Sequence, residues 1–315
     1  MLTAPEVLVA APLPDATMAA LDKAFTVHRL WQGVPDADLA GVRAMAASTL
    51  AGPIGPALFA RLPALEIVAN FGVGYDNIDM PAAVNRGLVV TNTAGVLDEE
   101  VGDLTLGLLL ATLRRIPAAE RFLRDGCWAQ GAFPLSPSLC GRRVGIVGLG
   151  GIGKAIARRL SGFSVDIAWY GRNAQPDVVW PRYPSVLALA KACDVLIVIV
   201  PGGAGTRHMI DGAVLAALGP QGVLINVSRG TVVDETALIA ALQQRTILAA
   251  GLDVFENEPD VPAALLACDN AVLLPHIGSA SQMTRQAMGQ LMVDNLSAWF
   301  ATGAALTPVA ETRYR

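Results

Sequence analysis

Three glycines, and two polar residues after the next predicted strand, have the types and spacing to bind a dinucleotide. The stretch VGIVGLGGIGKAIARRL carries Gly148, Gly150 and Gly153 as G-x-G-x-x-G between a strand pattern and a helix pattern. In that context the first glycine permits a tight turn, the second lets a pyrophosphate approach the backbone, and the third lets helix and strand pack closely. The N-terminus of the helix faces the anion. The pattern predicts a dinucleotide-binding turn, although plain strand-to-helix connections also contain it.

The residues after the following strand bear on which dinucleotide binds. A carboxylate there accepts hydrogen bonds from the 2′-hydroxyl of NAD, whereas an arginine accommodates the 2′-phosphate of NADP. The sequence WYGRN places Arg172 and Asn173 at this position, and the nearby acid, Asp166, lies at the opposite end of the strand. Because guanidinium N–H groups suit phosphate oxygens, we expect the protein to prefer NADP as its cofactor, with NAD also possible. The alternative is a solvated Arg172 that stacks on adenine without selecting the phosphate.

Two further residues follow predicted parallel strands, where the sites of α/β proteins form. Arg229, in NVSRG, can bind a carboxylate and polarise a carbonyl oxygen. His276, in LLPHIG, can exchange a proton near neutral pH. Taken alone, the two residues also fit a surface arginine in a turn and a structural histidine. The structural interpretation is the one we adopt for His28 and His208.

Apolar strands alternate with helical patterns along the chain, which is typical of βαβ units and parallel sheets. The first block contains predicted strands near 6–11, 26–30, 42–48, 65–71 and 87–91 and helices near 14–24, 54–61 and 79–85. A long helix is predicted to start after Asp98 and to run through Arg115. The second block contains predicted strands near 143–147, 165–170, 194–200, 222–227, 247–252 and 271–274, and a last helix near 281–301. The sequence predicts an α/β protein with two domains.

Composition limits the class of protein. The 315 residues are 53% apolar, yet no uninterrupted apolar run reaches the ~18 residues that a membrane helix needs. The N-terminus lacks the basic region of a signal peptide. The four cysteines are scattered, which predicts no metal site and fits a reducing, cytoplasmic setting. A net charge of -4 without basic runs argues against nucleic-acid binding. We expect a soluble protein that acts on a small molecule.

Several motifs, taken together and in this order, resemble the D-2-hydroxyacid dehydrogenase family. They are NFGVGYDNID, VTNTAGVLDEEVGDLTLGLLL, GRRVGIVGLGGIG, INVSRGTVVDETALIAAL, GLDVFENEP and LLPHIGSAS, and they span most of residues 65–285. The arginine of WYGRN and the stretch FPLSPSL resemble the glyoxylate/hydroxypyruvate reductase branch. This resemblance implies an NADPH-dependent enzyme that reduces small 2-keto acids, glyoxylate to glycolate and hydroxypyruvate to D-glycerate.

The resemblance also implies an architecture. Two Rossmann-like domains with doubly wound parallel sheets would hold the active site in the cleft between them. Residues 1–97 and 286–315 would form a flavodoxin-like substrate-binding domain, and residues 98–285 would form the dinucleotide-binding Rossmann domain. The family implies a homodimer in which Trp128 or Phe133, from a Gly- and Pro-rich loop expected at the surface, reaches the active site of the partner.

Catalytic roles come from the same resemblance. Arg229, Glu258 and His276 form the implied catalytic set, in which Glu258 of FENEP orients the histidine and keeps it protonated. The backbone N–H groups of Val73 and Gly74, with Arg229 and His276, would bind the substrate, although this stretch also fits a plain turn. Neighbouring Glu256 is expected to be solvated. The implied cofactor contacts, besides the glycines and Arg172 and Asn173, are Thr105, Ile152, Pro201, Thr206, Val227, Asp253 and Gly278.

One position departs from the family, because Gly151 stands where many relatives have an arginine within the glycine turn. A charged contact to the pyrophosphate is therefore missing. Two alternatives stay open. One is an NAD-dependent D-2-hydroxyacid dehydrogenase for a bulkier substrate, and the other is a dinucleotide-sensing corepressor that mainly binds partner peptides.

Overall fold

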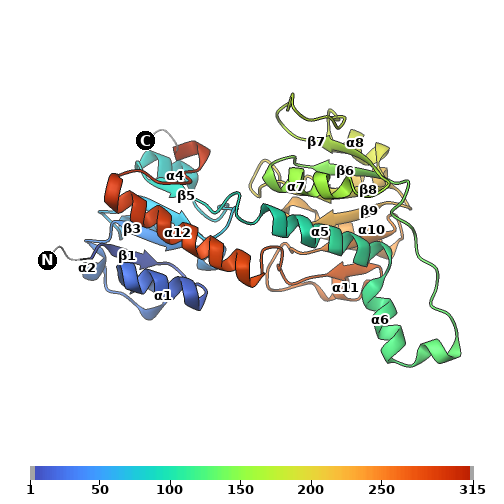
Figure 1. Cartoon of the computed structure of the whole chain (residues 1–315), viewed down its shortest axis with the longest axis horizontal. Helices are drawn as coiled ribbons and strands as arrows, with labels where there is room; N and C mark the ends of the chain where they lie inside the picture. Colours follow the sequence, from blue (N-terminus) through green and yellow to red (C-terminus); the bar gives the residue numbers. More distant parts are fainter. Residues whose placement is uncertain (1–3, 313–315) are drawn as a thin grey trace. The chain divides into compact units, whose positions relative to one another are not determined.

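A computed structural model describes residues 4–312, which divide into two α/β units (Figure 1). Unit 1 contains the described residues up to Leu97 and those from Ser281 onward, and unit 2 is Asp98–Ala280. The expected boundary at 286 falls inside helix α12 (Gln282–Thr302), which begins directly after Ser281. Because a helix packs as one body, the whole of α12 belongs to unit 1, where it contacts α1 and β4.

Unit 1 is a parallel sheet with strand order β2-β1-β3-β4-β5. The strands are β1 (Glu6–Val9), β2 (Thr26–Arg29), β3 (Ala44–Ala47), β4 (Ile67–Asn70) and β5 (Val89–Thr91). The helices are α1 (Asp15–Ala24), α2 (Asp36–Leu39), α3 (Pro56–Ala60), α4 (Met80–Asn85) and α12, with short 3-10 turns η1 (Leu30–Gln32), η2 (Thr49–Ala51) and η5 (Ala310–Thr312). Strands β3 and β4 are buried along their whole length, as expected for strands covered on both faces.

Unit 2 is a parallel sheet with strand order β11-β10-β9-β8-β6-β7. The strands are β6 (Arg143–Val147), β7 (Asp166–Tyr170), β8 (Val195–Val198), β9 (Val223–Asn226), β10 (Ala249–Leu252) and β11 (Ala271–Leu273). The helices are α5 (Asp98–Leu113), α6 (Ile116–Arg124), α7 (Gly151–Leu160), α8 (Val186–Ala192), α9 (Gly212–Leu218), α10 (Glu235–Gln243) and α11 (Ala263–Leu266), with 3-10 turns η3 (Cys127–Gln130) and η4 (Gly230–Val232). The chain leaves β6 for β7 and returns to β8 on the other side, so the order reverses at β6. Ligands bind at such a reversal in α/β sheets.

The predicted α/β class and doubly wound parallel sheets are confirmed, and each predicted strand is present with ends shifted by a few residues. The helix predicted to run from after Asp98 through Arg115 begins at Asp98 itself and ends earlier, at Leu113. Its extension is prevented by Arg115, which adopts a left-handed conformation with φ 53° and starts the separate helix α6. Within residues 4–312, no helix is both long and apolar enough to cross a membrane.

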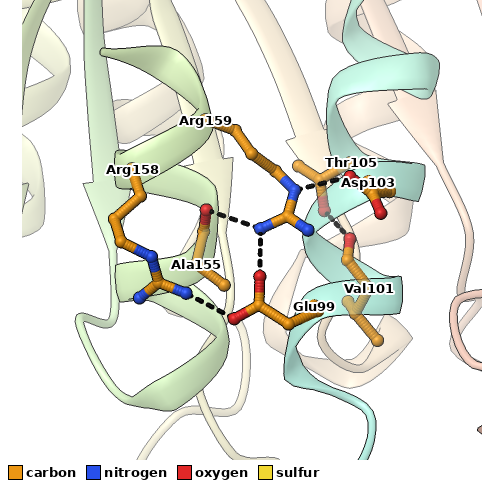
Figure 2. A network of polar contacts seen from close by, with 7 residues as sticks. All are labelled: Glu99, Val101, Asp103, Thr105, Ala155, Arg158 and Arg159. Atoms are coloured by element: carbon orange, nitrogen blue, oxygen red, sulfur yellow. Dashed lines mark hydrogen bonds and ion pairs between the residues drawn. The ribbon is translucent and has the colours of Figure 1, made fainter. Parts of the chain in front are cut away.

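A network of charged side chains joins α5 to α7, the helix that follows the glycine turn (Figure 2). Glu99 accepts hydrogen bonds from Arg158 and, at 2.7 Å, from Nη1 of Arg159. Nε of Arg159 donates to Asp103 at 2.6 Å. Gly102 makes room for this guanidinium, because a Cβ there would lie 3.1 Å from Nη1. The network therefore fixes the start of α5 against α7.

The network predicts a pH-dependent stability. The hydrogen bond from Arg159 holds the pKa values of Glu99 and Asp103 below their usual range. Carboxylates with lowered pKa values stabilise the fold above their unfolded pKa, and this contribution is lost as the pH falls through the folded pKa. We expect Arg159→Gln to lower the Tm by roughly 2–4 °C at pH 7. The difference from wild type should shrink below about pH 4 and in ~1 M salt.

The matched control is Arg245→Gln, because Arg245 makes a single exposed ion pair with Asp269 at 2.7 Å. Thermal unfolding of both variants and the wild type across pH 3–8 measures the effect. A Tm difference for Arg159→Gln that stayed constant over this range would show that the carboxylates contribute nothing to it.

Candidate active site

The first pair of catalytic candidates lies at the carboxyl-terminal edge of the sheet of unit 2. Glu258 follows β10 and His276 follows β11, and Oε2 of Glu258 lies 2.6 Å from Nδ1 of His276. The other carboxylate oxygen, Oε1, accepts the N–H of Phe255 at 3.0 Å. Because an ionised carboxylate only accepts hydrogen bonds, Nδ1 carries the proton. Nε2 is then the ring atom left to exchange a proton with a ligand.

The environment of Glu258 keeps it ionised. Burial by itself would raise the pKa of Glu258, but the hydrogen bond to His276 and the charge of that ring lower it. The N–H of Phe255 and the charge of Arg229 act in the same direction, so the pKa ends below its usual range. An ionised Glu258 therefore remains a hydrogen-bond acceptor for Nδ1 of His276.

Asp253 holds the turn that carries the histidine. It is buried at the end of β10, and its backbone oxygen accepts the N–H of His276 at 2.9 Å. Its carboxylate accepts the N–H groups of Ile277 at 2.7 Å and Gly278 at 2.8 Å. His276 itself has φ 53°, a conformation that needs such support. Burial raises the pKa of Asp253. These contacts within the turn were not expected from the sequence, and the cofactor contact implied for Asp253 stays a prediction.

Arg229 follows the neighbouring strand β9 and precedes the turn η4. Its backbone oxygen accepts from the side-chain amide of Asn226 at 3.0 Å, and its Nη1 donates to the oxygen of Ser228 at 2.8 Å. The next residue, Gly230, is pressed against Phe255, because a Cβ there would lie 1.8 Å from the carbonyl carbon of Phe255. The loop of Arg229 therefore packs on the segment that carries Glu258. The three catalytic candidates thus follow three adjacent strands, β9, β10 and β11.

Glu256 is not the solvated residue expected from the sequence. Only 19% of its side chain is exposed, and Oε1 accepts from Arg207 at 2.7 Å and contacts Nε2 of His208 at 3.1 Å. These contacts tie the loop after β8 to the segment after β10. His28 makes a similar contact with Glu6 at 3.1 Å in unit 1. Both histidines therefore have a local carboxylate partner, as His276 also does, and their structural interpretation stays a prediction.

The glycine turn forms an open cradle after β6. A Cβ at Gly148 would lie 2.2 Å from the oxygen of Ile199, and a Cβ at Gly153 would lie 2.2 Å from the oxygen of Gly148. Both positions are closed to larger residues by backbone. A Cβ at Gly150 would meet no atom within 4 Å, so the backbone there is accessible to a ligand. Since α7 begins at Gly151 with Ile152 in its first turn, the residues fit a pyrophosphate at a helix N-terminus.

The glycine at 151 has a local explanation. A Cβ at this position would lie 2.1 Å from Oδ2 of Asp98, the first residue of α5. The carboxylate thus occupies the space into which a side chain would extend. An arginine here would require Asp98 to move.

Arg172 and Asn173 are exposed after β7. Within residues 4–312 the guanidinium of Arg172 has no protein partner, so it is available to a ligand. Arg182 fixes the backbone here, with Nη2 donating to the oxygens of Gly171 at 2.8 Å and Arg172 at 3.1 Å. The side chain of Gln175 donates to the oxygen of Leu149 at 2.7 Å, which links this loop to the glycine turn. No local sequence signal points to Arg182 or Gln175.

The remaining cofactor candidates are placed as follows. Thr206 donates its hydroxyl to the oxygen of Pro201 at 2.7 Å, which closes the loop after β8. Val227 is buried at the end of β9. Thr105 is fully buried in α5, with its hydroxyl bonded to the oxygen of Val101 at 2.6 Å. Their contacts with a cofactor stay predictions.

The expected substrate residues Val73 and Gly74 belong to unit 1, in the loop after β4. A separate cavity of about 460 Å³ in unit 2 is lined by residues at the amino-terminal ends of β6 and β7, including Arg143 and Asp166. It lies at the opposite end of these strands from the glycine turn. The candidate catalytic residues and the glycine turn follow the carboxyl-terminal ends of the strands. The candidate active site is therefore at that edge of the sheet and not in this cavity.

Comparison with known proteins agrees with this geometry. Residues 106–278 match the family described as D-isomer specific 2-hydroxyacid dehydrogenase, NAD binding domain. The chain is 44% identical over 308 residues to a glyoxylate/hydroxypyruvate reductase A of Arabidopsis thaliana, covering 96% of this chain and 98% of that protein. It is 40% identical over 315 residues to a 2-ketogluconate reductase of Gluconobacter oxydans, covering 98% and 100%.

Solved structures show the same likeness. The crystal structure of an NADPH-dependent glyoxylate/hydroxypyruvate reductase from Sinorhizobium meliloti, in complex with NADP and malonate, matches with a TM-score of 0.95 and 53% identity over 99% of both chains. A glyoxylate reductase from Paecilomyes thermophila matches with a TM-score of 0.90 and 30% identity over 99% of both chains. The family predicted from the motifs is confirmed. The chain belongs to the D-isomer specific 2-hydroxyacid dehydrogenases and is an oxidoreductase that uses a nicotinamide dinucleotide.

Proposed function

We propose that this protein is an NADPH-preferring reductase of small 2-keto acids, with glyoxylate and hydroxypyruvate as substrates and glycolate and D-glycerate as products. The observation that carries the proposal is the 2.6 Å contact between His276 and Glu258, with Arg229 after the adjacent strand. Relatives named as reductases of these two acids, one of them a complex with NADP and malonate, support the choice of substrate and cofactor.

Each residue of the set has a role in the reduction. The guanidinium of Arg229 binds the substrate carboxylate and polarises the keto oxygen. A reduced nicotinamide dinucleotide, held by the glycine turn, would supply the hydride for the keto carbon. His276 gives the proton on Nε2 to the developing alkoxide, so that one hydride and one proton convert the keto acid to the hydroxy acid. Glu258 stabilises the imidazolium before that transfer and holds Nδ1 in place.

Cofactor preference would reside in the loop after β7. Arg172 and Asn173 are exposed beside the glycine turn, and their side chains offer N–H donors to a 2′-phosphate. NADH lacks this phosphate and would gain nothing from the arginine charge. The proposal therefore includes a preference for NADPH that depends on Arg172.

Initial rates with glyoxylate and hydroxypyruvate, each with NADPH and NADH, test the proposal directly. A kcat/KM at least tenfold higher with NADPH, about 1.4 kcal/mol, would support the assigned cofactor. A preference for NADH would overturn the cofactor assignment and keep the reductase. Activity with 2-ketogluconate alone would favour a bulkier substrate. No turnover of any 2-keto acid, with cofactor-dependent peptide binding instead, would favour the corepressor alternative.

The protein is proposed to act as a homodimer. In unit 2, the segment of α6 and η3 exposes large apolar side chains, among them Leu123 at 56% and Trp128 at 68%. Phe133 packs edge-on against Phe122 at 5.3 Å, which gives the segment a defined shape. Such exposed apolar groups mark interaction sites.

Analytical ultracentrifugation tests the dimer. We expect the wild-type protein to have the mass of a dimer and Leu123→Glu to have the mass of a monomer. The control is Leu266→Glu, on the exposed face of α11, which should stay a dimer. A monomeric wild type would overturn the proposal.

A further inference from the structure

Two side-chain amides fix the loop Gly72–Val73–Gly74. Nδ2 of Asn70, the last residue of β4, donates to the oxygens of Gly72 at 3.1 Å and Gly74 at 3.0 Å. Nδ2 of Asn92, just after the adjacent strand β5, donates to the oxygen of Val73 at 2.9 Å. Each of the three carbonyl groups in the loop therefore accepts a hydrogen bond from an asparagine side chain.

These bonds determine where the backbone N–H groups point. In a trans peptide the C=O of one residue and the N–H of the next point in opposite directions. The N–H of Val73 therefore points away from Asn70, and the N–H of Gly74 points away from Asn92. Neither N–H has an acceptor among the described residues, and both residues are partly exposed. Gly72 permits the arrangement with φ 145°, which favours glycine. The loop thus presents two neighbouring donors to a ligand.

In the side-chain amide of Asn70, the NH₂ group makes the hydrogen bonds and the oxygen makes none. The side chain is 1% exposed, and Oδ1 has no hydrogen-bond partner in the part of the chain that the structure describes. The opposite amide orientation would place this oxygen against two carbonyl oxygens, so the network determines the assignment. Buried polar atoms without partners are rare and call for an explanation. Orientation of the loop provides one.

We propose that Asn70 and Asn92 are positioning residues that aim the N–H groups of Val73 and Gly74 at the carboxylate of the 2-keto acid. The inference rests on the proposed function, since it assumes an acidic substrate. Hydrogen bonds to a carboxylate are stronger than those between neutral groups. The orientation of the two N–H groups therefore affects the affinity for the substrate. Asn70 spans two carbonyl groups and Asn92 only one, so Asn70 has the larger effect. Proton transfer by His276 does not depend on either residue.

The test compares Asn70→Ala and Asn92→Ala with a matched control, Asn270→Ala. The amide of Asn270 also donates to two carbonyl oxygens, of Leu242 at 3.3 Å and Leu248 at 3.1 Å, but just before β11, at the amino-terminal edge of the sheet of unit 2. We expect Asn70→Ala to raise the KM for glyoxylate by at least about tenfold, which corresponds to about 1.4 kcal/mol. The kcat and the Kd of NADPH should stay within about threefold of wild type.

A direct binding measurement separates this inference from the proposed function. Calorimetric titration with malonate, in the presence of NADP, should show a weaker Kd for Asn70→Ala by about the same factor as the KM. Asn70→Asp keeps the shape of the side chain but not the donors, and should bind malonate as weakly as Asn70→Ala. Asn270→Ala should bind malonate like the wild type, whatever its loss of Tm.

Three results would overturn the inference: wild-type malonate binding by Asn70→Ala, wild-type binding by Asn70→Asp, or an equal loss in Asn270→Ala. If Asn70→Ala does not fold, the same comparison is made with Asn92→Ala, which loses a single hydrogen bond. If the wild-type enzyme reduces no 2-keto acid, the proposed function fails. The malonate titration then still decides whether the two asparagines orient an anion-binding loop.

Discussion

Replacing His276 with alanine should lower kcat for 2-keto acid reduction by about 10²–10⁴-fold. The imidazole is the group that gives a proton to the alkoxide, and its Nδ1 is bound to Glu258 at 2.6 Å. Binding of NADPH should stay nearly unchanged, because the glycine turn and Arg172 lie in other loops of unit 2. Steady-state kinetics with glyoxylate and fluorescence titration with NADPH measure the two effects separately.

The control for this variant is His28→Ala, because His28 also pairs with a carboxylate, that of Glu6, at 3.1 Å. It should keep kcat within about threefold of wild type. An unchanged kcat in His276→Ala would remove this residue from the mechanism. A parallel loss of NADPH affinity would show that the substitution disturbs the fold of unit 2 and does not report on proton transfer.

Glu258 adds a pH dependence to the same prediction. Because its pKa lies below the usual range, the carboxylate stays ionised as the pH falls past about 4.3, the ordinary value for glutamate. The imidazolium therefore keeps its partner in mildly acidic solution, and kcat should show no acid limb above that pH. Glu258→Gln has no charge to stabilise the imidazolium and should lower kcat at least about tenfold. A kcat that decreased already between pH 6 and pH 5 would contradict this account.

Replacing Arg172 with alanine should raise the KM for NADPH by about 10–100-fold and leave the KM for NADH within about twofold. The guanidinium is exposed after β7, and its backbone is held in place by Arg182 at 3.1 Å. A charged donor that faces a phosphate contributes only when the phosphate is present. Kinetics with both cofactors, and titration of each cofactor to the enzyme without substrate, measure the difference.

The control for Arg172→Ala is Arg245→Ala, which removes the same charge from another exposed site of unit 2, the ion pair with Asp269. It should weaken neither cofactor by more than about twofold. Equal effects of Arg172→Ala on NADPH and NADH would mean that the arginine contacts adenine or solvent and does not recognise the 2′-phosphate.

Local sequence patterns determined much of the fold. Continuous apolar runs such as VLIV of β8 and AMAA of β3 became buried parallel strands, because strands covered on both faces bury every side chain. The glycine turn was recognised from its spacing. A Cβ at Gly153 would meet the oxygen of Gly148 five residues earlier, and a Cβ at Gly148 would meet the oxygen of Ile199, after the adjacent strand β8. Arg229 and His276 could be placed at strand ends for the same local reason. Their joint role with Glu258 came from the family resemblance and not from the residues themselves.

The tertiary structure alone decided which distant side chains support the site. Asp253 holds the turn of His276, Glu256 binds His208, and Arg182 holds the backbone of Arg172. Periodicity says which face of an element is buried, but not which strands become neighbours or how their loops meet. The order β11-β10-β9-β8-β6-β7 brings together loops that lie far apart in the chain. Hydrogen bonds form only within about 3.5 Å, so these partners exist only once that order is set.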